Sequence, residues 1–219
     1  MKVPKWKNNQ ELYSSPVTEK NGQLIKEMNY KETYVTNFLD DDPIRDWESI
    51  NGCKLLWSFL ISELNGEKNI KNWTVLDVGT KDCQFPEMLN KADYIKDALG
   101  IEIADSYIEY AKSKNRPIMK GDACDLPFKD NSWDIVFSHH LLGLVKDNKK
   151  ALEEMLRVSK KYVITLANIP GNPKKHYSYI RNLSTVSKWL EEMSCEVLYV
   201  GKTIFCRGDE KVIFLKKLF

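Results

Sequence analysis

Carboxylates stand at the ends of three predicted β-strands, and a glycine-bearing turn follows the first of them. Asp77 lies in the run WTVLDVG (73–79), Glu102 in ALGIEI (98–103), and Asp122 in the weaker run PIMKGDA (117–123). Parallel strands bring their carboxyl ends to one edge of a sheet, where open α/β sheets bind ligands. The three acids would form a polar rim over an adenosine-sized groove, with Glu102 placed to hold ribose hydroxyl groups.

The turn after Asp77, residues 79–83 (GTKDC), differs from a dinucleotide-binding loop. Such a loop needs G-x-G-x-x-G so that its backbone can contact a pyrophosphate, whereas Lys81 and Gln84 stand at the second and third glycine positions. Asp77 and Asp82 flank the turn and would repel a diphosphate. The turn therefore favours a ligand with a cationic group. A nicotinamide oxidoreductase, which shares this kind of sheet, is kept as a disfavoured interpretation because the glycines are missing.

Two adjacent histidines, His139 and His140, directly follow a fourth predicted strand, WDIVFS (133–138). Imidazole titrates near neutral pH, so either side chain is a candidate general base. Successive residues leaving a strand point in opposite directions, and one of the two is expected to face the groove. The alternative is that both have packing or hydrogen-bonding roles. The histidines and the five widely spaced cysteines lack the spacing of a metal site, so no protein-bound metal is expected.

The elements that must position these residues alternate along the chain. From Val75 onward, short runs rich in β-branched residues alternate with segments of helical period, which is typical of parallel strands joined by crossover helices. A fifth strand is YVITLA (162–167), and CEVLYVG (195–201) with KVIFLKKLF (211–219) predicts a closing antiparallel hairpin. Apolar residues at helical spacing predict helices over 50–64, 104–111, 151–156 and 183–193.

Composition excludes several classes of protein. The chain has 219 residues, 33 basic and 31 acidic, so its formal charge of +2 gives no field that would attract nucleic acid. No apolar run reaches the ~20 residues of a membrane span, and the opening MKVPKWKNNQ lacks the apolar core of a signal peptide. We therefore expect a cytoplasmic protein with neither a nucleic-acid partner nor a membrane span; its oligomeric state is not predicted.

Four segments together resemble the successive motifs of the class I S-adenosylmethionine-dependent methyltransferases. They are VLDVGTKDCQFPEML, LGIEIADSYIEYAK, GDACDLPFKDNSWDIVFSHHLLGLV and ALEEMLRVSKKYVIT, and they span roughly residues 73–165. The resemblance implies an α/β fold: a doubly wound, mostly parallel, seven-stranded Rossmann-like sheet that ends in a C-terminal antiparallel hairpin. It also implies a methyltransferase with S-adenosyl-L-methionine as its cofactor.

The resemblance assigns roles to the residues at the strand ends. The methionine moiety would be held by Asp77, Gly79, Thr80 and Lys81. Glu102 would bind the ribose, Ile103 would lie against the adenine, and Asp122 and Ala123 would contact the adenine edge. Ser138 with His139 would close the cofactor site from the fourth strand.

One departure from the family pattern concerns the 79–83 turn. The family usually shows D-x-G-x-G-x-G, whereas Lys81 and Cys83 stand at the second and third glycine positions. The Lys81 side chain must therefore swing outward or contact the cofactor carboxylate. The departure leaves open an alternative, a methyltransferase-like binding or scaffold protein that has lost catalysis.

The residues after the fourth strand indicate the class of acceptor. Enzymes of this superfamily that methylate amino groups of bases or glutamine typically carry [N/D]-P-P-[Y/F] there, whereas this chain has SHHL (138–141). This favours a small-molecule acceptor, a hydroxyl or carboxylate of a sugar, lipid or metabolite. Residues 50–219 are expected to form the methyltransferase domain. The aromatic-containing segment 1–49, as a cap or packing segment, and the loop 168–182, rich in basic and aromatic residues, are expected to set specificity.

Overall fold

The chain divides into two compact units, residues 1–41 and 42–219. The computed structural model describes residues 17–20, 23–26, 43–64, 67, 69–169, 182–203, 206 and 209–218, with side chains from residue 50 onward. In the first unit, β1 (Val17–Lys20) pairs with β2 (Gln23–Lys26) as an antiparallel hairpin. The predicted division after residue 49 and the cap or packing role of residues 1–49 stay predictions, and most of the 168–182 loop lies outside the described residues.

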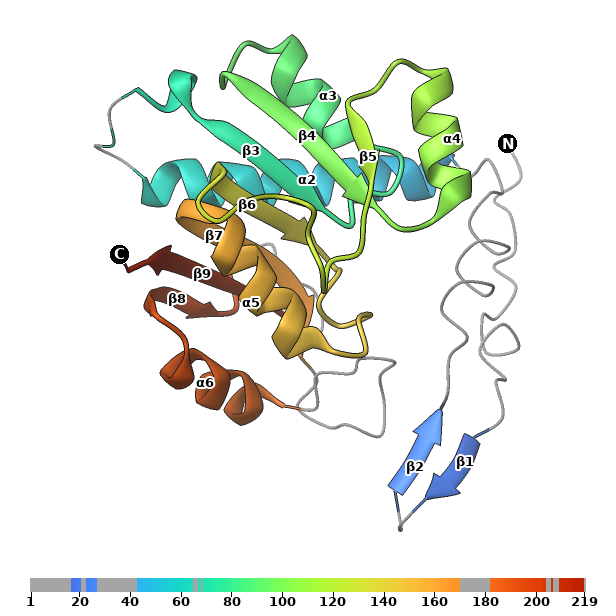
Figure 1. The fold of residues 1–219 in the computed structure, drawn as a ribbon, viewed down its shortest axis with the longest axis vertical. Helices are drawn as coiled ribbons and strands as arrows, with labels where there is room; N and C mark the ends of the chain where they lie inside the picture. Colours follow the sequence, from blue (N-terminus) through green and yellow to red (C-terminus); the bar gives the residue numbers. More distant parts are fainter. Residues whose placement is uncertain are drawn as a thin grey trace. The chain divides into compact units, whose positions relative to one another are not determined.

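A seven-stranded sheet forms the centre of the second unit, in the order β5-β4-β3-β6-β7-β9-β8 (Figure 1). β3, β4, β5, β6 and β7 are parallel to one another, and β9 runs antiparallel between β7 and β8. The predicted mostly parallel sheet with a C-terminal antiparallel hairpin is therefore confirmed. Its strands are β3 (Thr74–Val78), β4 (Asp97–Glu102), β5 (Ile118–Lys120), β6 (Trp133–His139), β7 (Ser159–Asn168), β8 (Cys195–Gly201) and β9 (Glu210–Lys217).

The strand register brings the candidate residues to one edge. Asp77 in β3 lies opposite Gly100 in β4 and opposite Phe137 in β6. Because β9 is antiparallel, its first residue, Glu210, pairs with Asn168 at the end of β7. The carboxyl ends of the parallel strands and the beginning of β9 therefore share one edge of the sheet.

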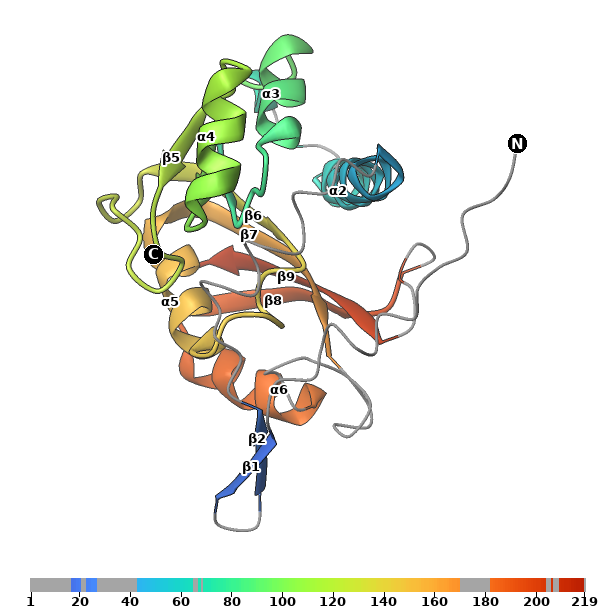
Figure 2. The same cartoon turned by 90° about the vertical axis from the view of Figure 1, so that its right-hand side faces the viewer.

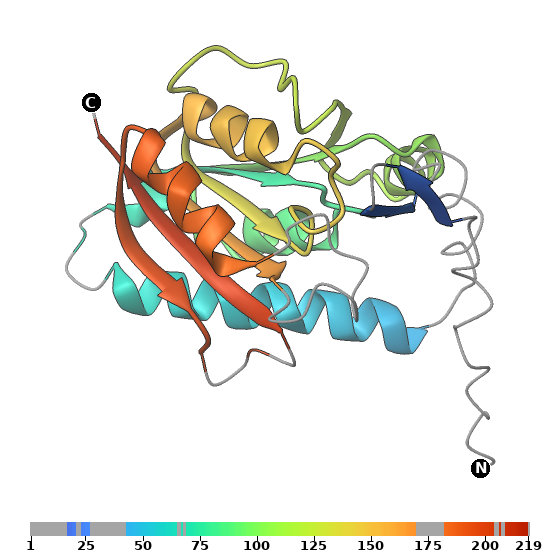
Figure 3. The same cartoon turned by 90° about the horizontal axis from the view of Figure 1, so that it is seen from below.

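Helices cover both faces of the sheet (Figures 2 and 3). One face carries α2 (Pro43–Glu63) and α3 (Gln84–Lys91), and the other carries α5 (Asn148–Val158) and α6 (Leu183–Glu192). α4 (Asp105–Ser113) packs on β4 and β5, and a short 3-10 helix, η2 (Ile70–Asn72), precedes β3. The helix predicted over 50–64 begins earlier, at Pro43, because proline is favoured at a first helical position.

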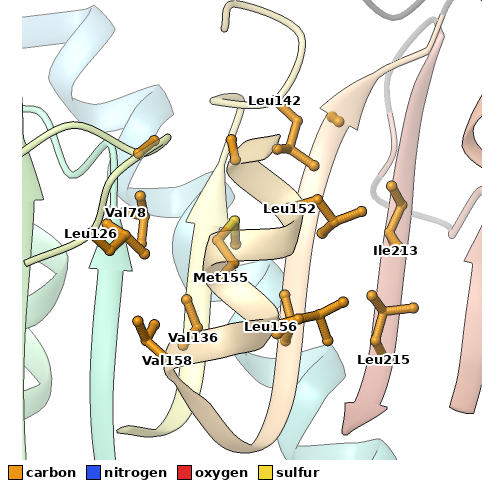
Figure 4. Close-up of a cluster of buried hydrophobic side chains, with 14 of the residues drawn as sticks. Val78, Leu126, Val136, Leu142, Leu152, Met155, Leu156, Val158, Ile213 and Leu215 are labelled. Atoms are coloured by element: carbon orange, nitrogen blue, oxygen red, sulfur yellow. The ribbon is translucent and has the colours of Figure 1, made fainter. Parts of the chain in front are cut away.

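Two buried apolar clusters hold these layers together. Beneath α5, Leu152 and Met155 pack with Val136 of β6 and Leu215 of β9 (Figure 4). On the other face, Leu56 and Leu60 of α2 pack with residues such as Phe137 and Phe214. Each of these fully buried side chains contributes roughly 1.5–3 kcal/mol to stability. The sheet is thus a rigid support for its carboxyl edge.

Among the helices that the structure describes, none is both long enough and apolar enough to cross a membrane.

Candidate functional site

Three residues of the 79–83 turn have left-handed backbone angles, although only one of the three is a glycine. Gly79, Lys81 and Cys83 have φ angles of 74°, 60° and 61°. The amides of Gly79 and Thr80 donate to the Ile101 carbonyl oxygen at 2.9 and 3.0 Å, which ties the turn to β4. A residue with a Cβ atom in this left-handed conformation costs about 1–2 kcal/mol. The chain therefore maintains the turn against local strain.

The Lys81 side chain is directed toward α4. Its Nζ lies 5.8 Å from the centre of the Tyr107 ring, in cation–π range. The two alternatives for this side chain, outward or against the cofactor carboxylate, stay predictions. The backbone of Lys81 faces the site, since its amide donates to Glu102 Oε2 at 2.9 Å.

We expect Lys81→Gly to have a free energy of unfolding about 1 kcal/mol higher than Lys81→Ala. Both variants lose the same charge and the same contact with Tyr107, so their difference isolates the left-handed strain at φ 60°. Urea unfolding of the two variants measures it. Equal stabilities would mean that the turn relaxes to another conformation.

Glu102 is the hydrogen-bonding centre of the site. It is buried, with 7% of its surface exposed. Besides the Lys81 amide on Oε2, its Oε1 accepts from the amides of Ile103 at 2.8 Å and Ala104 at 3.1 Å. Burial raises the pKa of this carboxyl, and the three backbone amides partly oppose the rise. A carboxylate has about four acceptor positions, so Glu102 retains room for roughly one further donor, such as a hydroxyl group.

Asp77 is a second buried carboxyl at the same edge. Thr80 Oγ1 donates to its Oδ2 at 2.7 Å. Burial raises the pKa of Asp77 to about 7, the Thr80 hydrogen bond opposes this, and the charges of Glu102 and Asp82 add to the rise. Two buried carboxyl groups at one edge are costly to ionise, so this edge is electrostatically suited to a cationic group.

Gly100 supplies the space into which the turn packs. A Cβ atom on Gly100 would lie 2.5 Å from Thr80 Cγ2 and 2.6 Å from Cys83 Sγ. The buried Cys83 thiol occupies that space and donates to the Pro117 carbonyl oxygen at 3.0 Å. A small residue on β4 therefore accommodates the cysteine at the third glycine position of the turn.

We expect Gly100→Ala to lower the free energy of unfolding by about 1–3 kcal/mol, because the added methyl group overpacks the contact between β4 and the turn. Chemical denaturation measures the loss. Cys83→Ala, made in the same background, should restore part of the loss because it removes one of the two clashes. Failure of this rescue would contradict the packing argument.

The remaining cofactor candidates differ in exposure. Ile103 presents 39% of its surface and Asp122 is exposed, whereas Ala123 is buried. Asp122 Oδ1 accepts from the Cys124 amide at 2.8 Å. Ser138 is fully buried, and its hydroxyl lies 3.1 Å from Thr165 Oγ1 on β7. The adenine contacts expected of Ile103, Asp122 and Ala123 and the closing role of Ser138 stay predictions.

His139 and His140 do not point in opposite directions as expected, since their ring centres lie 4.4 Å apart; the left-handed φ of 60° at His140 breaks the strand geometry, and the two rings contact different elements. A Cβ atom on Gly52 of α2 would lie only 2.4 Å from His139 Nε2, so this imidazole fills the space of the missing side chain. Burial and the neighbouring His140 lower the pKa of His139 to about 3. His140 lies on the β9 side, with its Nε2 3.3 Å from Oε1 of Glu210.

Sequence reasoning missed Glu210. The residue lies far from His140 in the chain, and only the pairing of β9 with β7 brings the two together. A usable signal was the predicted hairpin itself, because its second strand must begin at the carboxyl edge if it runs antiparallel to β7.

Two buried polar atoms near this edge bear on whether the residues fit a polar cofactor. Asn51 Nδ2 and Ser106 Oγ have no hydrogen-bond partner in the described part of the chain. Ser106 belongs to the first turn of α4, four residues after Glu102, and Asn51 precedes the glycine that meets His139. Buried polar atoms are normally satisfied, so these two favour a polar ligand at the site. With the remaining acceptor position of Glu102 and the buried acids, the residues fit a cofactor that carries hydroxyl groups and a positive charge.

A separate hollow of about 450 Å³ lies between α2 and α3 and includes none of the predicted site residues. Its lining consists of Ile50, Lys54, Gln84, Glu87, Met88, Lys91, Ala92 and Arg116.

Comparison with known proteins agrees with the fold and the motifs. Residues 76–165 match the methyltransferase domain family. The chain is 39% identical over 108 residues to a demethylmenaquinone methyltransferase of Renibacterium salmoninarum, a match that covers 48% of this chain and 43% of the relative. A protein of the same name from Staphylococcus saprophyticus is 32% identical over 101 residues, 43% of each chain. The chain thus spans less than half the length of these relatives in the match.

Solved structures extend the likeness to most of the chain. Magnesium protoporphyrin IX methyltransferase from Synechocystis PCC 6803, solved with bound S-adenosylhomocysteine, superposes with a TM-score of 0.64 at 14% identity and covers 85% of this chain and 99% of its own. A methyltransferase from Aquifex aeolicus superposes with a TM-score of 0.57 at 20% identity, and the match covers 74% of this chain and 89% of the Aquifex chain. At these identities the likeness shows the fold, and the fold expected from the sequence motifs is confirmed.

Proposed function

We propose that this chain, whose residues 76–165 match the methyltransferase domain family, transfers the methyl group of S-adenosyl-L-methionine to a small-molecule acceptor. The observation that carries the proposal is the 79–83 turn, which keeps left-handed angles at Gly79, Lys81 and Cys83 and is held by the buried Glu102. A strained backbone of this kind persists when the surrounding structure maintains it, and such strain clusters at ligand sites.

Different residues at this edge of the sheet would bind different parts of the cofactor. Asp77 and the 79–83 turn would hold the charged methionine end, Glu102 would accept one ribose hydroxyl, and Ile103 with Ala123 would contact the adenine. The bound cofactor supplies an activated methyl group on a cationic sulfur. The chain supplies position and charge: Asp77 and Glu102 are buried acids that favour a cation, and the rigid sheet fixes the distance to the acceptor.

The loss-of-catalysis alternative is not favoured. It rested on Lys81 and Cys83 in place of two glycines, and both residues adopt the angles that glycine would take. Lys81 directs its side chain to Tyr107, and Gly100 makes room for Cys83. The two substitutions are thus accommodated without a change in the path of the turn.

The acceptor is proposed to be a small molecule. The curated relatives are named for demethylmenaquinone, and the Synechocystis structure is named for magnesium protoporphyrin IX. We propose a hydroxyl or carboxylate of a lipid, sugar or metabolite as the acceptor class, reduced demethylmenaquinone as the first compound to test, and the cytoplasm as the location.

Isothermal titration of the full chain with S-adenosylmethionine and S-adenosylhomocysteine tests the proposal. Binding of both, followed by transfer of a radiolabelled methyl group to reduced demethylmenaquinone or to a compound from a metabolite extract, is the expected result. No heat of binding with either compound at millimolar concentration would overturn the assignment and restore the scaffold alternative.

A further inference from the structure

We infer that His140 and Glu210 form a general-base pair, with His140 taking a proton from a hydroxyl-bearing acceptor and Glu210 positioning the imidazole. This inference rests on the proposed function and narrows its acceptor class. His140 was one of two sequence candidates, and Glu210 was not among them.

The pair lies at the edge that carries the cofactor candidates. β6 lies between β3 and β7, so a residue directly after β6 is adjacent to the end of β3. Leu141, the next residue, contacts the turn: a Cβ atom on Gly79 would lie 2.7 Å from Leu141 Cδ1. Glu210 reaches the same edge from β9, where it pairs with Asn168.

The backbone of His140 is held in an unusual conformation. Its φ angle is 60°, and its amide donates to the Leu166 carbonyl oxygen at 2.8 Å. Left-handed angles are uncommon outside glycine and occur at functional sites more often than elsewhere. The sheet thus fixes the direction of the His140 side chain at a cost in strain.

The side-chain contact determines which nitrogen is free. His140 Nε2 lies 3.3 Å from Glu210 Oε1, so this nitrogen faces the carboxylate. We infer that Nε2 carries the proton and that Nδ1 keeps the lone pair that acts as the base. The His140 side chain is 32% exposed and that of Glu210 is 14% exposed, so the imidazole is accessible while its partner is largely shielded. This is the arrangement of a base oriented by a third group.

His139 does not fit the same role. Its ring is buried against Gly52, and burial lowers its pKa to about 3, which makes it a weak base. It packs edge-on against His140, with ring centres 4.4 Å apart, and so limits rotation of the His140 imidazole. The titratable side chains in contact with His140 include His139 of β6 and Glu210 of β9.

The proton transfer runs from the acceptor hydroxyl to the His140 imidazole. The O–H bond of the acceptor breaks, the proton forms an N–H bond at His140 Nδ1, and the oxygen keeps the electron pair with which it takes the methyl group. The positive charge gained by the imidazole faces the Glu210 carboxylate, and the exposed ring returns the proton to water.

The pair therefore indicates an acceptor that has a proton to lose, an alcohol, phenol or enol. A carboxylate is already ionised and would be repelled by Glu210, so we infer a hydroxyl acceptor rather than a carboxylate.

Nitrogen-15 NMR of the histidine rings in the full chain, without any ligand, tests the contact. The wild type should show the His140 Nε2–H tautomer, Glu210→Ala should show a tautomer mixture, and Glu210→Gln should retain the wild-type tautomer because its amide oxygen still accepts. Glu196→Ala is the matched control, since it removes an acid of β8 that is half exposed and 3.9 Å from Lys216. An Nδ1–H tautomer in the wild type, or no change in Glu210→Ala, overturns the pair.

Methyl transfer to 1,4-dihydroxynaphthalene as a phenolic probe tests the role. Glu210→Ala should lower kcat roughly 10–100-fold at unchanged KM for S-adenosylmethionine, with partial rescue in Glu210→Gln. An unchanged kcat overturns the inference. Absence of S-adenosylhomocysteine binding to the wild type would instead refute the proposed function, and the ligand-free NMR result separates the two failures.

Discussion

Replacement of Glu102 by alanine is expected to lower the free energy of unfolding by about 2–4 kcal/mol and to abolish cofactor binding. The variant leaves the buried or partly buried amides of Lys81, Ile103 and Ala104 without their acceptor. Each unsatisfied buried donor costs about 1–3 kcal/mol, and removal of a desolvated carboxyl offsets part of the sum. The turn and the start of α4 lose their common anchor, so the effect combines stability and function.

Glu102→Gln separates these two effects. Its single amide oxygen can keep the Ile103 and Ala104 amides, but its NH₂ group would face the Lys81 amide as a second donor. We expect a stability loss of about 1 kcal/mol with affinity for S-adenosylhomocysteine still reduced about tenfold or more. Glu109→Ala, on the exposed face of α4, is the control for charge. Wild-type affinity in Glu102→Gln would remove Glu102 from the cofactor site.

The sequence predicted the parts of the site that depend on local pattern. The alternation of apolar runs and helical stripes predicted the strands and helices. An acid at the end of each run placed Asp77 and Glu102 at one edge, and in the register of β3 and β4 Asp77 lies opposite Gly100, two residues before Glu102. β5 ends at Lys120, earlier than expected, and Asp122 lies beyond it in an isolated bridge with Asp125. The shortening reflects the turn that the Asp122 carboxylate stabilises through the Cys124 amide.

The features that the sequence could not predict depend on contacts between distant segments. Local propensity argues against left-handed angles at Lys81 and Cys83, and only the anchors from Ile101 and Glu102 and the space at Gly100 make them possible. His139 and His140 could not be told apart, because the missing side chain of Gly52 receives one ring and the register of β9 brings Glu210 to the other.

The second large effect concerns Asp77 and the pH dependence of stability. The pKa of this carboxyl rises from 3.8 to about 7 on folding, chiefly through burial. Because the folded state binds the proton more tightly, the contribution of Asp77 to stability is fully present below the unfolded pKa of 3.8 and is lost as the pH rises through about 7. The ligand-free wild type should therefore lose stability between about pH 4 and pH 7, and Glu102, whose pKa is also raised, adds to the same trend.

Asp77→Asn should remove most of this slope. Near pH 4 the variant and the wild type should be similar in stability, and near pH 8 the variant should be more stable by about 2–4 kcal/mol, since each pKa unit corresponds to about 1.4 kcal/mol. The Asn side chain can still accept the Thr80 hydrogen bond, so the charge is the main change. Urea unfolding across this pH range measures the difference, with Asp97→Asn, an exposed acid at the other end of β4, as the control.

The same substitution should weaken binding while it strengthens the fold. A buried carboxylate that is costly in the free protein becomes favourable when a cationic ligand lies beside it, so Asp77→Asn should lower the affinity for S-adenosylmethionine at about pH 8 by tenfold or more. In the wild type, binding should displace the Asp77 proton, and calorimetry in buffers of different ionisation enthalpy should detect its release near pH 7, where Asp77 titrates. A variant that gained stability and kept its affinity would show that the Asp77 charge acts on the fold alone and that the cationic end of the cofactor is held elsewhere.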